Sequence, residues 1–266
     1  MKKLWLVFVL VSLPLWLGGC GAGEPGAVRP LKVATTTGPH AELLYAAREL
    51  AAADGLTVEI LEYADNQKAN DLLVRGEVDA NSFQPQPYFD SLVADRQWSL
   101  VAVARTVVFP VALYSQKISR LADLPPGAIV AIPNDPAGEA RALLLLEKAG
   151  VITLRAGVGA KAAVIDIVAN PKNIRLRQLD ADKLPGRLGE FDLVAIHSTF
   201  AVAAGLVPAR DALACEGADS PFAHIIAVQA KDKDNPAVAT LVKAYRSDHV
   251  KDYIGRRFQG AVVATW

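Results

Sequence analysis

Cysteine is scarce in this chain, since only Cys20 and Cys215 occur among its 266 residues. A framework of several disulfides is therefore excluded. An excess of either charge is also missing, because 28 acidic residues balance 28 basic ones. That balance argues against a nucleic-acid-binding protein and against a polybasic membrane-surface protein. Apolar residues, in contrast, make up 52% of the chain, too many for a disordered protein, and the length allows one large domain or two of ordinary size.

A hydrophobic run long enough to cross a membrane is missing as well. A membrane-spanning helix needs roughly 20 apolar residues, whereas the N-terminal run covers 14 residues, 4–17, and contains Pro14. Because this run follows the basic start MKK, it predicts a signal peptide over residues 1–19. The run ends in LGGC, which resembles a bacterial lipobox, so Cys20 is expected to carry a lipid such as palmitate. Residues 20–30 are then the lipidated N-terminus and a flexible tether, with an ordinary signal peptide and a coincidental cysteine as the alternative.

The usual signatures of enzymes are absent too. The sequence contains no GxSxG elbow, no P-loop, no HExxH motif and no glycine-rich dinucleotide fingerprint after its first strand. Its histidines, His40, His197, His224 and His249, are scattered without the spacing of helical metal ligands. Cys215 has no catalytic context and is expected to be a small, partly buried residue. We therefore predict no enzyme activity, no metal and no cofactor.

What the sequence does contain is a regular alternation of strand and helix patterns, typical of an open α/β fold. The helix predicted over 134–150 has the clearest signals, with Asp135 as N-cap, Pro136 at the first helical position and Gly150 at the end. Strands are predicted at 31–37, 56–63, 100–115, 127–133, 173–179 and 191–197. Further helices are predicted at 38–55, 67–77, 88–96, 235–247 and 249–260, with a short one near 180–189.

The order of these elements predicts two lobes with a ligand cleft between them. Residues 31–113 together with 223–266 form lobe 1, and residues 114–222 form lobe 2. Two β-rich segments cross between the lobes, as closure of a hinge around a ligand requires. A single large sheet is the alternative that composition leaves open.

The segment 81–90, NSFQPQPYFD, contains two prolines that lack a backbone donor. Pro85 and Pro87 therefore predict an extended, rigid connection here and argue against a central strand or a helix interior. Such a connection either serves only as a loop or holds side chains in place for a ligand.

Arg141 is the strongest single candidate for binding chemistry. It lies two turns into the helix that Asp135 begins, where a guanidinium can grip a carboxylate with two hydrogen bonds. His197 and His224 lie at predicted strand ends, where ligands of open α/β folds bind. The alternatives are a surface arginine paired with an acid and two structural histidines.

Several collinear blocks resemble the NlpA/MetQ lipoprotein family, the substrate-binding proteins of bacterial methionine ABC importers. The blocks are TTTGPHAELL (35–44), VDANSFQPQPYFD (78–90), AIPNDPAGEARALLLLEKAG (131–150), IVANPKNIRL (167–176), DSPFAHIIAV (219–228) and GAVVATW (260–266). The resemblance extends from the lipobox to the C-terminus. It implies a two-lobed periplasmic-binding-protein-like fold and assigns the ligand carboxylate to Arg141.

Several pocket positions depart from the family pattern. Asparagines of the family correspond to His197, Thr199 and His224 here, and a pocket tyrosine corresponds to Asn66. In the family segment FFQHQPY, a histidine corresponds to Pro85 and an aromatic residue to Ser82. Because histidine and threonine offer other hydrogen bonds than asparagine does, the ligand preference is expected to differ. The predicted ligand-binding residues are Asn66, Phe83, Pro85, Tyr88, Arg141, His197, Thr199 and His224.

The resulting expectation is a lipid-anchored solute-binding protein of the cell envelope. It would capture methionine or a related amino-acid-like carboxylate and deliver it to an ABC permease and its ATPase, facing the periplasm or the exterior. A non-transport envelope lipoprotein that keeps the fold is the alternative, and neither version involves nucleic acid.

Overall fold

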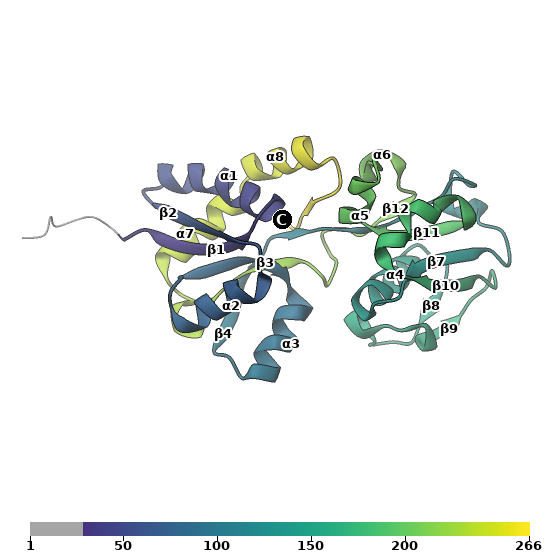
Figure 1. Ribbon diagram of the computed structural model, residues 1–266, viewed down its shortest axis with the longest axis horizontal. Coiled ribbons are helices and arrows are strands. Elements are labelled where there is room, and N and C mark those ends of the chain that lie inside the picture. Colours follow the sequence, from purple (N-terminus) through teal and green to yellow (C-terminus); the bar gives the residue numbers. More distant parts are fainter. Residues whose placement is uncertain (1–28) are drawn as a thin grey trace, which may run out of the picture.

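The computed structural model describes residues 29–266, and the side chain of Asn66 is not described. The predicted signal peptide and Cys20 lie outside the described residues. Two lobes, each built on a five-stranded sheet, lie side by side along the long axis of the molecule (Figure 1). This arrangement confirms the predicted α/β, two-lobed fold.

Lobe 1 has a sheet with the strand order β2-β1-β3-β13-β4. Strand β1 is parallel to β2 and β3, whereas β13 runs antiparallel to both β3 and β4. The chain therefore returns from lobe 2 to place its late strand β13 inside the sheet. The strands are β1 (Leu31–Thr36), β2 (Val58–Tyr63), β3 (Ala80–Pro85), β4 (Leu100–Arg105) and β13 (His224–Gln229).

Helices cover both faces of this sheet (Figure 1). One core cluster joins α1, α7 and α8 to the first face, and another joins α2 and α3 to the second. Residues on these helices recur with helical spacing and bury their apolar side chains against the strands. The helices are α1 (Pro39–Ala53), α2 (Asn66–Arg75), α3 (Gln86–Arg96), α7 (Pro236–Tyr245) and α8 (Asp248–Phe258).

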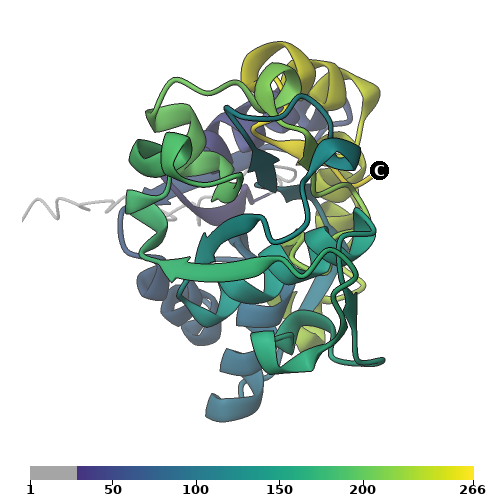
Figure 2. The same ribbon diagram turned by 90° about the vertical axis from the view of Figure 1, so that its right-hand side faces the viewer.

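Lobe 2, which faces the viewer in Figure 2, has a sheet with the order β10-β7-β11-β6-β12. Helix α4 (Pro136–Lys148) packs on one face of it, and α5 (Ser198–Ala203) with two short 3-10 helices, Ala181–Lys183 and Pro185–Glu190, packs on the other. The strands are β6 (Val111–Tyr114), β7 (Ile129–Pro133), β10 (Arg175–Leu179), β11 (Leu193–His197) and β12 (Ala214–Cys215). The smaller elements are α6 (Pro208–Asp211) and the paired strands β8 (Thr153–Leu154) and β9 (Ile167–Ala169).

Two chain segments cross between the lobes. The first follows β4 and enters lobe 2 at Val111, where β6 begins, so β6 starts before the boundary that we predicted at residue 113. The second runs from β12 to β13. A short strand of the first crossing, β5 (Val107–Val108), pairs with the C-terminal strand β14 (Val263–Ala264).

The residues that predict the start and end of α4 have the expected roles in the structure. The side chain of Asp135 accepts a hydrogen bond of 2.8 Å from the backbone N–H of Gly138, and Pro136 lies in the first turn. Gly150 then has a φ of 72°, which ends the helix.

The prediction for NSFQPQPYFD was wrong in part. Residues up to Pro85 form β3, a central strand between β1 and β13, rather than an extended connection. The strand tolerates Pro85 because it is the last residue, and Pro87 lies in the first turn of α3, where a missing N–H costs nothing. The helix predicted over 88–96 is confirmed, with its start at Gln86.

Candidate functional site: a cleft between two lobes

The edge of the lobe 1 sheet that faces lobe 2 contributes two histidines. His40 lies in the first turn of α1, directly after β1. His224 is the first residue of β13 and pairs with Pro85, the last residue of β3. We predicted His224 at the end of a strand, but it begins one. It reaches the cleft because an antiparallel strand starts at the edge where its parallel neighbours end.

A cluster of three rings forms at this edge. The ring centroids of His40 and His224 are 4.8 Å apart, and Phe109 lies 4.7 Å from His40 and 5.0 Å from His224. Such separations are typical of attractive ring contacts. Because Phe109 belongs to the first crossing, the cluster connects the lobe 1 edge to the hinge.

Lobe 2 contributes Arg141, His197 and Thr199, which line one cavity of about 350 Å³. Arg141 projects from the second turn of α4, and His197 is the last residue of β11. Thr199 follows at the start of α5. The structure therefore brings together three of the predicted ligand-binding residues on one face of the cleft.

Arg141 is buried, at 8% exposure, and its guanidinium has specific partners. Its Nε donates to both carboxylate oxygens of Glu216 at 3.1 Å, and its Nη2 donates to Glu216 and, at 2.6 Å, to the backbone oxygen of Phe109. Its Cζ lies 5.1 Å from the ring centroid of Phe222. Among the described residues none bonds to Nη1, so one edge of the guanidinium is available to a ligand.

All three cleft histidines are held in the neutral form. Burial lowers the pKa of His40 to about 4. Burial, with a smaller effect of the Arg141 charge, lowers the pKa of His197 to about 3. The pKa of His224 is lowered well below its usual value by burial and then by the proximity of His40 and Arg141, because a positive charge on either disfavours one on His224. At neutral pH the cleft therefore presents imidazoles rather than imidazolium ions.

Hydrogen bonds assign different tautomers to His197 and His224. Nδ1 of His197 accepts from the backbone N–H of Thr199 at 3.3 Å, so its Nε2 carries the proton and is a donor. Nδ1 of His224 lies 3.1 Å from the backbone oxygen of Phe83 and must donate to it, so its Nε2 is an acceptor. Lobe 2 thus offers donors and lobe 1 an acceptor.

The other predicted residues do not line this cavity. The Phe83 side chain is 4% exposed in the core of lobe 1, and only its carbonyl contacts a cleft histidine. Pro85 ends β3 beside His224, and Tyr88 is 40% exposed on α3. Asn66 begins α2, but its side chain lies outside the described residues, as does Cys20.

Sequence reasoning missed His40, Phe109 and Glu216 as parts of the site. His40 follows TTTGP at the start of a predicted helix, directly after a predicted strand. That position was a local signal for the cleft edge. Glu216 had none, because its contact with Arg141 spans 75 residues of the chain. The neighbouring Cys215 is partly buried, as predicted, and burial raises the pKa of its thiol to about 11.

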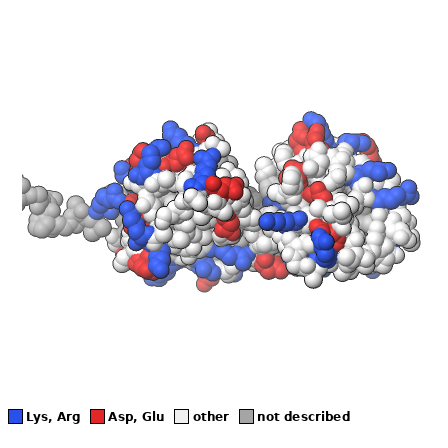
Figure 3. Space-filling model, turned by 90° about the horizontal axis from the view of Figure 1, so that it is seen from below, with Lys and Arg blue, Asp and Glu red and all other residues white. Residues whose placement is uncertain are grey.

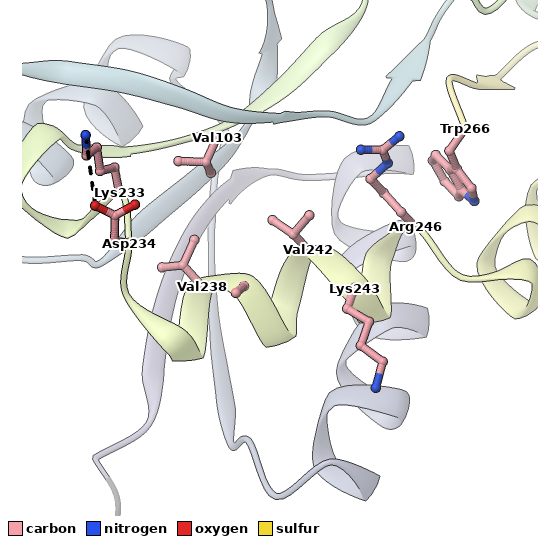
Figure 4. Close-up of a pocket in the computed structure, with 9 residues that line it drawn as sticks. Val103, Lys233, Asp234, Val238, Val242, Lys243, Arg246 and Trp266 are labelled. Atoms are coloured by element: carbon pink, nitrogen blue, oxygen red, sulfur yellow. Dashed lines mark ion pairs between the residues drawn. The ribbon is translucent and has the colours of Figure 1, made fainter.

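A wider hollow of about 720 Å³ lies on the outer side of lobe 1, between α7 and the edge strand β4 (Figure 4). Val103, Val238 and Val242 form its floor, with Arg246 and Trp266 at one end. None of the predicted ligand-binding residues lines this hollow, and it does not face lobe 2. The waist between the lobes, visible in Figure 3, is the place where both contribute.

No group of three or more metal-ligating side chains that could hold an ion occurs within residues 29–266. Over the same range, no helix has the length and apolar character needed to cross a bilayer. On the face shown in Figure 3, acidic and basic side chains are intermixed over both lobes.

Known proteins resemble this chain over nearly its full length. The D-methionine-binding lipoprotein MetQ of Yersinia pestis is 40% identical over 255 residues, which cover 95% of this chain and 94% of that protein. A nutrient-binding protein from Burkholderia cenocepacia, solved bound to methionine, is 45% identical with a TM-score of 0.68, covering 89% of this chain and all of that one.

A YaeC-family lipoprotein of Enterococcus faecalis is 32% identical, with a TM-score of 0.76 over 89% of this chain and 99% of its own. The family model of the NlpA lipoprotein matches residues 31–266. The chain therefore belongs to the NlpA lipoprotein family.

Proposed function

We propose that the protein is the solute-binding lipoprotein of an ABC importer and captures methionine or a closely related amino acid between its lobes. The observation that carries the proposal is that Arg141 lines one cavity with His197, while its Nη1 has no hydrogen-bond partner among the described residues. A guanidinium edge and the Nε2–H of His197 are two donors on one lobe, suited to a carboxylate. The methionine-bound relative supports this ligand class.

The opposite lobe suits the other end of an amino acid. Nε2 of His224 has a lone pair that can accept from an ammonium group, and His40 and Phe109 flank it with ring surfaces. Ligand contacts on both lobes stabilise the closed form by the difference in affinity between closed and open states. No chemical step is involved in this capture.

The proposed location is the cell envelope, with the lipid on Cys20 holding the protein at a membrane. An ABC permease and its ATPase would receive the ligand. Deletion of the gene is expected to lower uptake of the bound amino acid by whole cells, whereas unchanged uptake would favour a non-transport lipoprotein.

The direct test is to identify the ligand that co-purifies with the protein by mass spectrometry and to titrate that compound and L-methionine calorimetrically. Replacement Arg141→Lys keeps a positive charge beside Glu216 but removes the planar donor edge. We expect it to weaken binding at least about tenfold, because a charge-assisted bond is lost or displaced.

The matched control is Arg187→Lys, since Arg187 is exposed, forms an ion pair with Glu190 and does not line the cavity. It should bind as the wild type does. Failure of every amino acid to bind, or equal affinity in the Arg141→Lys variant, would overturn the proposal.

A further inference from the structure

Glu216 lies behind the ligand-facing edge of Arg141 and is itself buried, at 8% exposure. Its carboxylate accepts from Nε and Nη2 of Arg141, from the backbone N–H of Val111 at 2.8 Å, and weakly from Ser220 Oγ at 3.4 Å. Val111 ends the first crossing and Ser220 lies in the second. The position of this carboxylate is therefore fixed from several sides.

The pair leaves the cavity without surplus positive charge. Among the described side chains that line it, Arg141 alone carries a formal positive charge, and Asp135 adds a negative one. Glu216 offsets the charge of Arg141 from behind. A carboxylate that approaches Nη1 thus gains hydrogen bonds but meets repulsion from Glu216 across the guanidinium.

We propose that Glu216 is a specificity residue that makes the cleft select a net-neutral zwitterion and reject a lone anion. The inference rests on the proposed function and assigns the ligand's charge class. A ligand whose own ammonium group offsets its carboxylate brings no net charge to the site, whereas a simple carboxylic acid adds an uncompensated negative charge. A site that grips a carboxylate through an unpaired arginine would lack this discrimination.

The test compares L-methionine with its deaminated analogue, methylthiobutanoate, which has the same side chain and carboxylate. Calorimetric affinities for both compounds are measured in the wild type and in Glu216→Gln, which keeps acceptor oxygen and shape but removes the charge. We expect the preference for methionine over the analogue to fall at least about tenfold, mainly because the analogue binds more tightly.

Two further variants isolate the charge. Glu216→Asp moves the carboxylate but keeps its charge, so it should retain most of the preference. Glu147→Gln removes a carboxylate from the same helix as Arg141, but Glu147 accepts from the backbone N–H of Leu154 and does not line the cavity. It should leave the preference unchanged.

An unchanged preference in Glu216→Gln overturns the inference and leaves the proposed function intact. If that variant does not fold, as thermal melting would show, Glu216→Asp decides, because loss of the preference with the charge retained also overturns it. If the wild type binds neither compound, methionine is not the ligand, and the comparison uses the co-purifying amino acid and its deaminated analogue. Failure of every amino acid to bind contradicts the proposed function itself.

Discussion

The cleft histidines share one physical property, which is that their surroundings in the folded protein keep them uncharged. Each ring is partly enclosed by neighbouring rings or strand ends, and Arg141 adds a positive charge that disfavours a second one nearby for His197 and His224. Neutral imidazole can donate at one nitrogen and accept at the other, so its ligand contacts depend on the tautomer. Protonation removes the acceptor.

Acid should therefore destabilise the fold before most carboxylates titrate. The pKa values of His40 and His197 lie at about 4 and about 3 in the folded state and near 6.5 in the unfolded chain. Between these values the unfolded chain binds more protons than the folded protein does. The free energy of unfolding is therefore highest above pH 6.5 and decreases as the pH falls. The urea concentration at the midpoint of unfolding should therefore decrease as the pH is lowered from 6.5 towards 4.

The matched variants are His40→Gln, which should flatten the pH dependence, and His249→Gln on the exposed side of α8, which should not. Equal pH profiles for wild type and His40→Gln would contradict the assignment.

At the scale of elements, β3 is held by a buried amide network that explains one glutamine of NSFQPQPYFD. Asn70 on α2 donates to Gln84 Oε1 at 2.9 Å and accepts from Gln84 and Asn81 at 2.8 Å each. All three side chains are at most 1% exposed. Helix and strand are thus linked by polar groups that have no access to water.

Replacement of Asn70 by Ala should lower the free energy of unfolding by about 2 kcal/mol or more, because buried amides of Asn81 and Gln84 lose partners. Urea unfolding measures it. Gln67→Ala, at an exposed position of the same helix, should change stability by under about 0.5 kcal/mol. If Asn70→Ala lowers the free energy of unfolding as little as Gln67→Ala does, water or a rearrangement of side chains satisfies the amides of Asn81 and Gln84.

Elements with local signals could be predicted from the sequence, and those that depend on distant partners could not. Asp135, Pro136 and Gly150 define α4 because each acts on backbone within one turn. The prediction that Pro85 excludes a central strand was wrong, because the cost of its missing N–H depends on which strand lies beside it at that position. The pairing of Pro85 with His224 lies outside any local window.

The same distinction applies to the site. Arg141, His197 and Thr199 could be predicted and lie together, whereas Glu216 and Phe109 reach Arg141 only through the folded crossings.

On the scale of the whole molecule, the lobes also meet outside the two crossings. The turn after α8 contacts α6 of lobe 2, where the backbone N–H of Ala209 donates to the oxygen of Gln259 at 3.2 Å. Gly260 has a φ of +85°, and a Cβ there would lie 2.8 Å from the nitrogen of Ala209. The close approach of the lobes at this point requires glycine.

Gly260→Ala should therefore disturb this contact and cost about 1 kcal/mol or more in stability. Thermal melting measures the loss of stability. The radius of gyration from X-ray scattering, without and with ligand, measures the disturbance of the contact between the lobes. Gly255→Ala on α8, where a Cβ meets nothing within 4 Å, should be neutral or slightly stabilising. Identical melting and scattering for Gly260→Ala and wild type would show that the turn adjusts freely.

The position of β13 has a consequence for how the chain folds as it is made. The strands of the lobe 2 sheet form a continuous stretch from β6 to β12, whereas the sheet of lobe 1 needs β13 between β3 and β4. Lobe 2 can therefore complete its sheet during synthesis, while lobe 1 remains open until residues 224–229 have emerged. The first half of the chain therefore waits longer for its native sheet than the segment that follows it in the sequence.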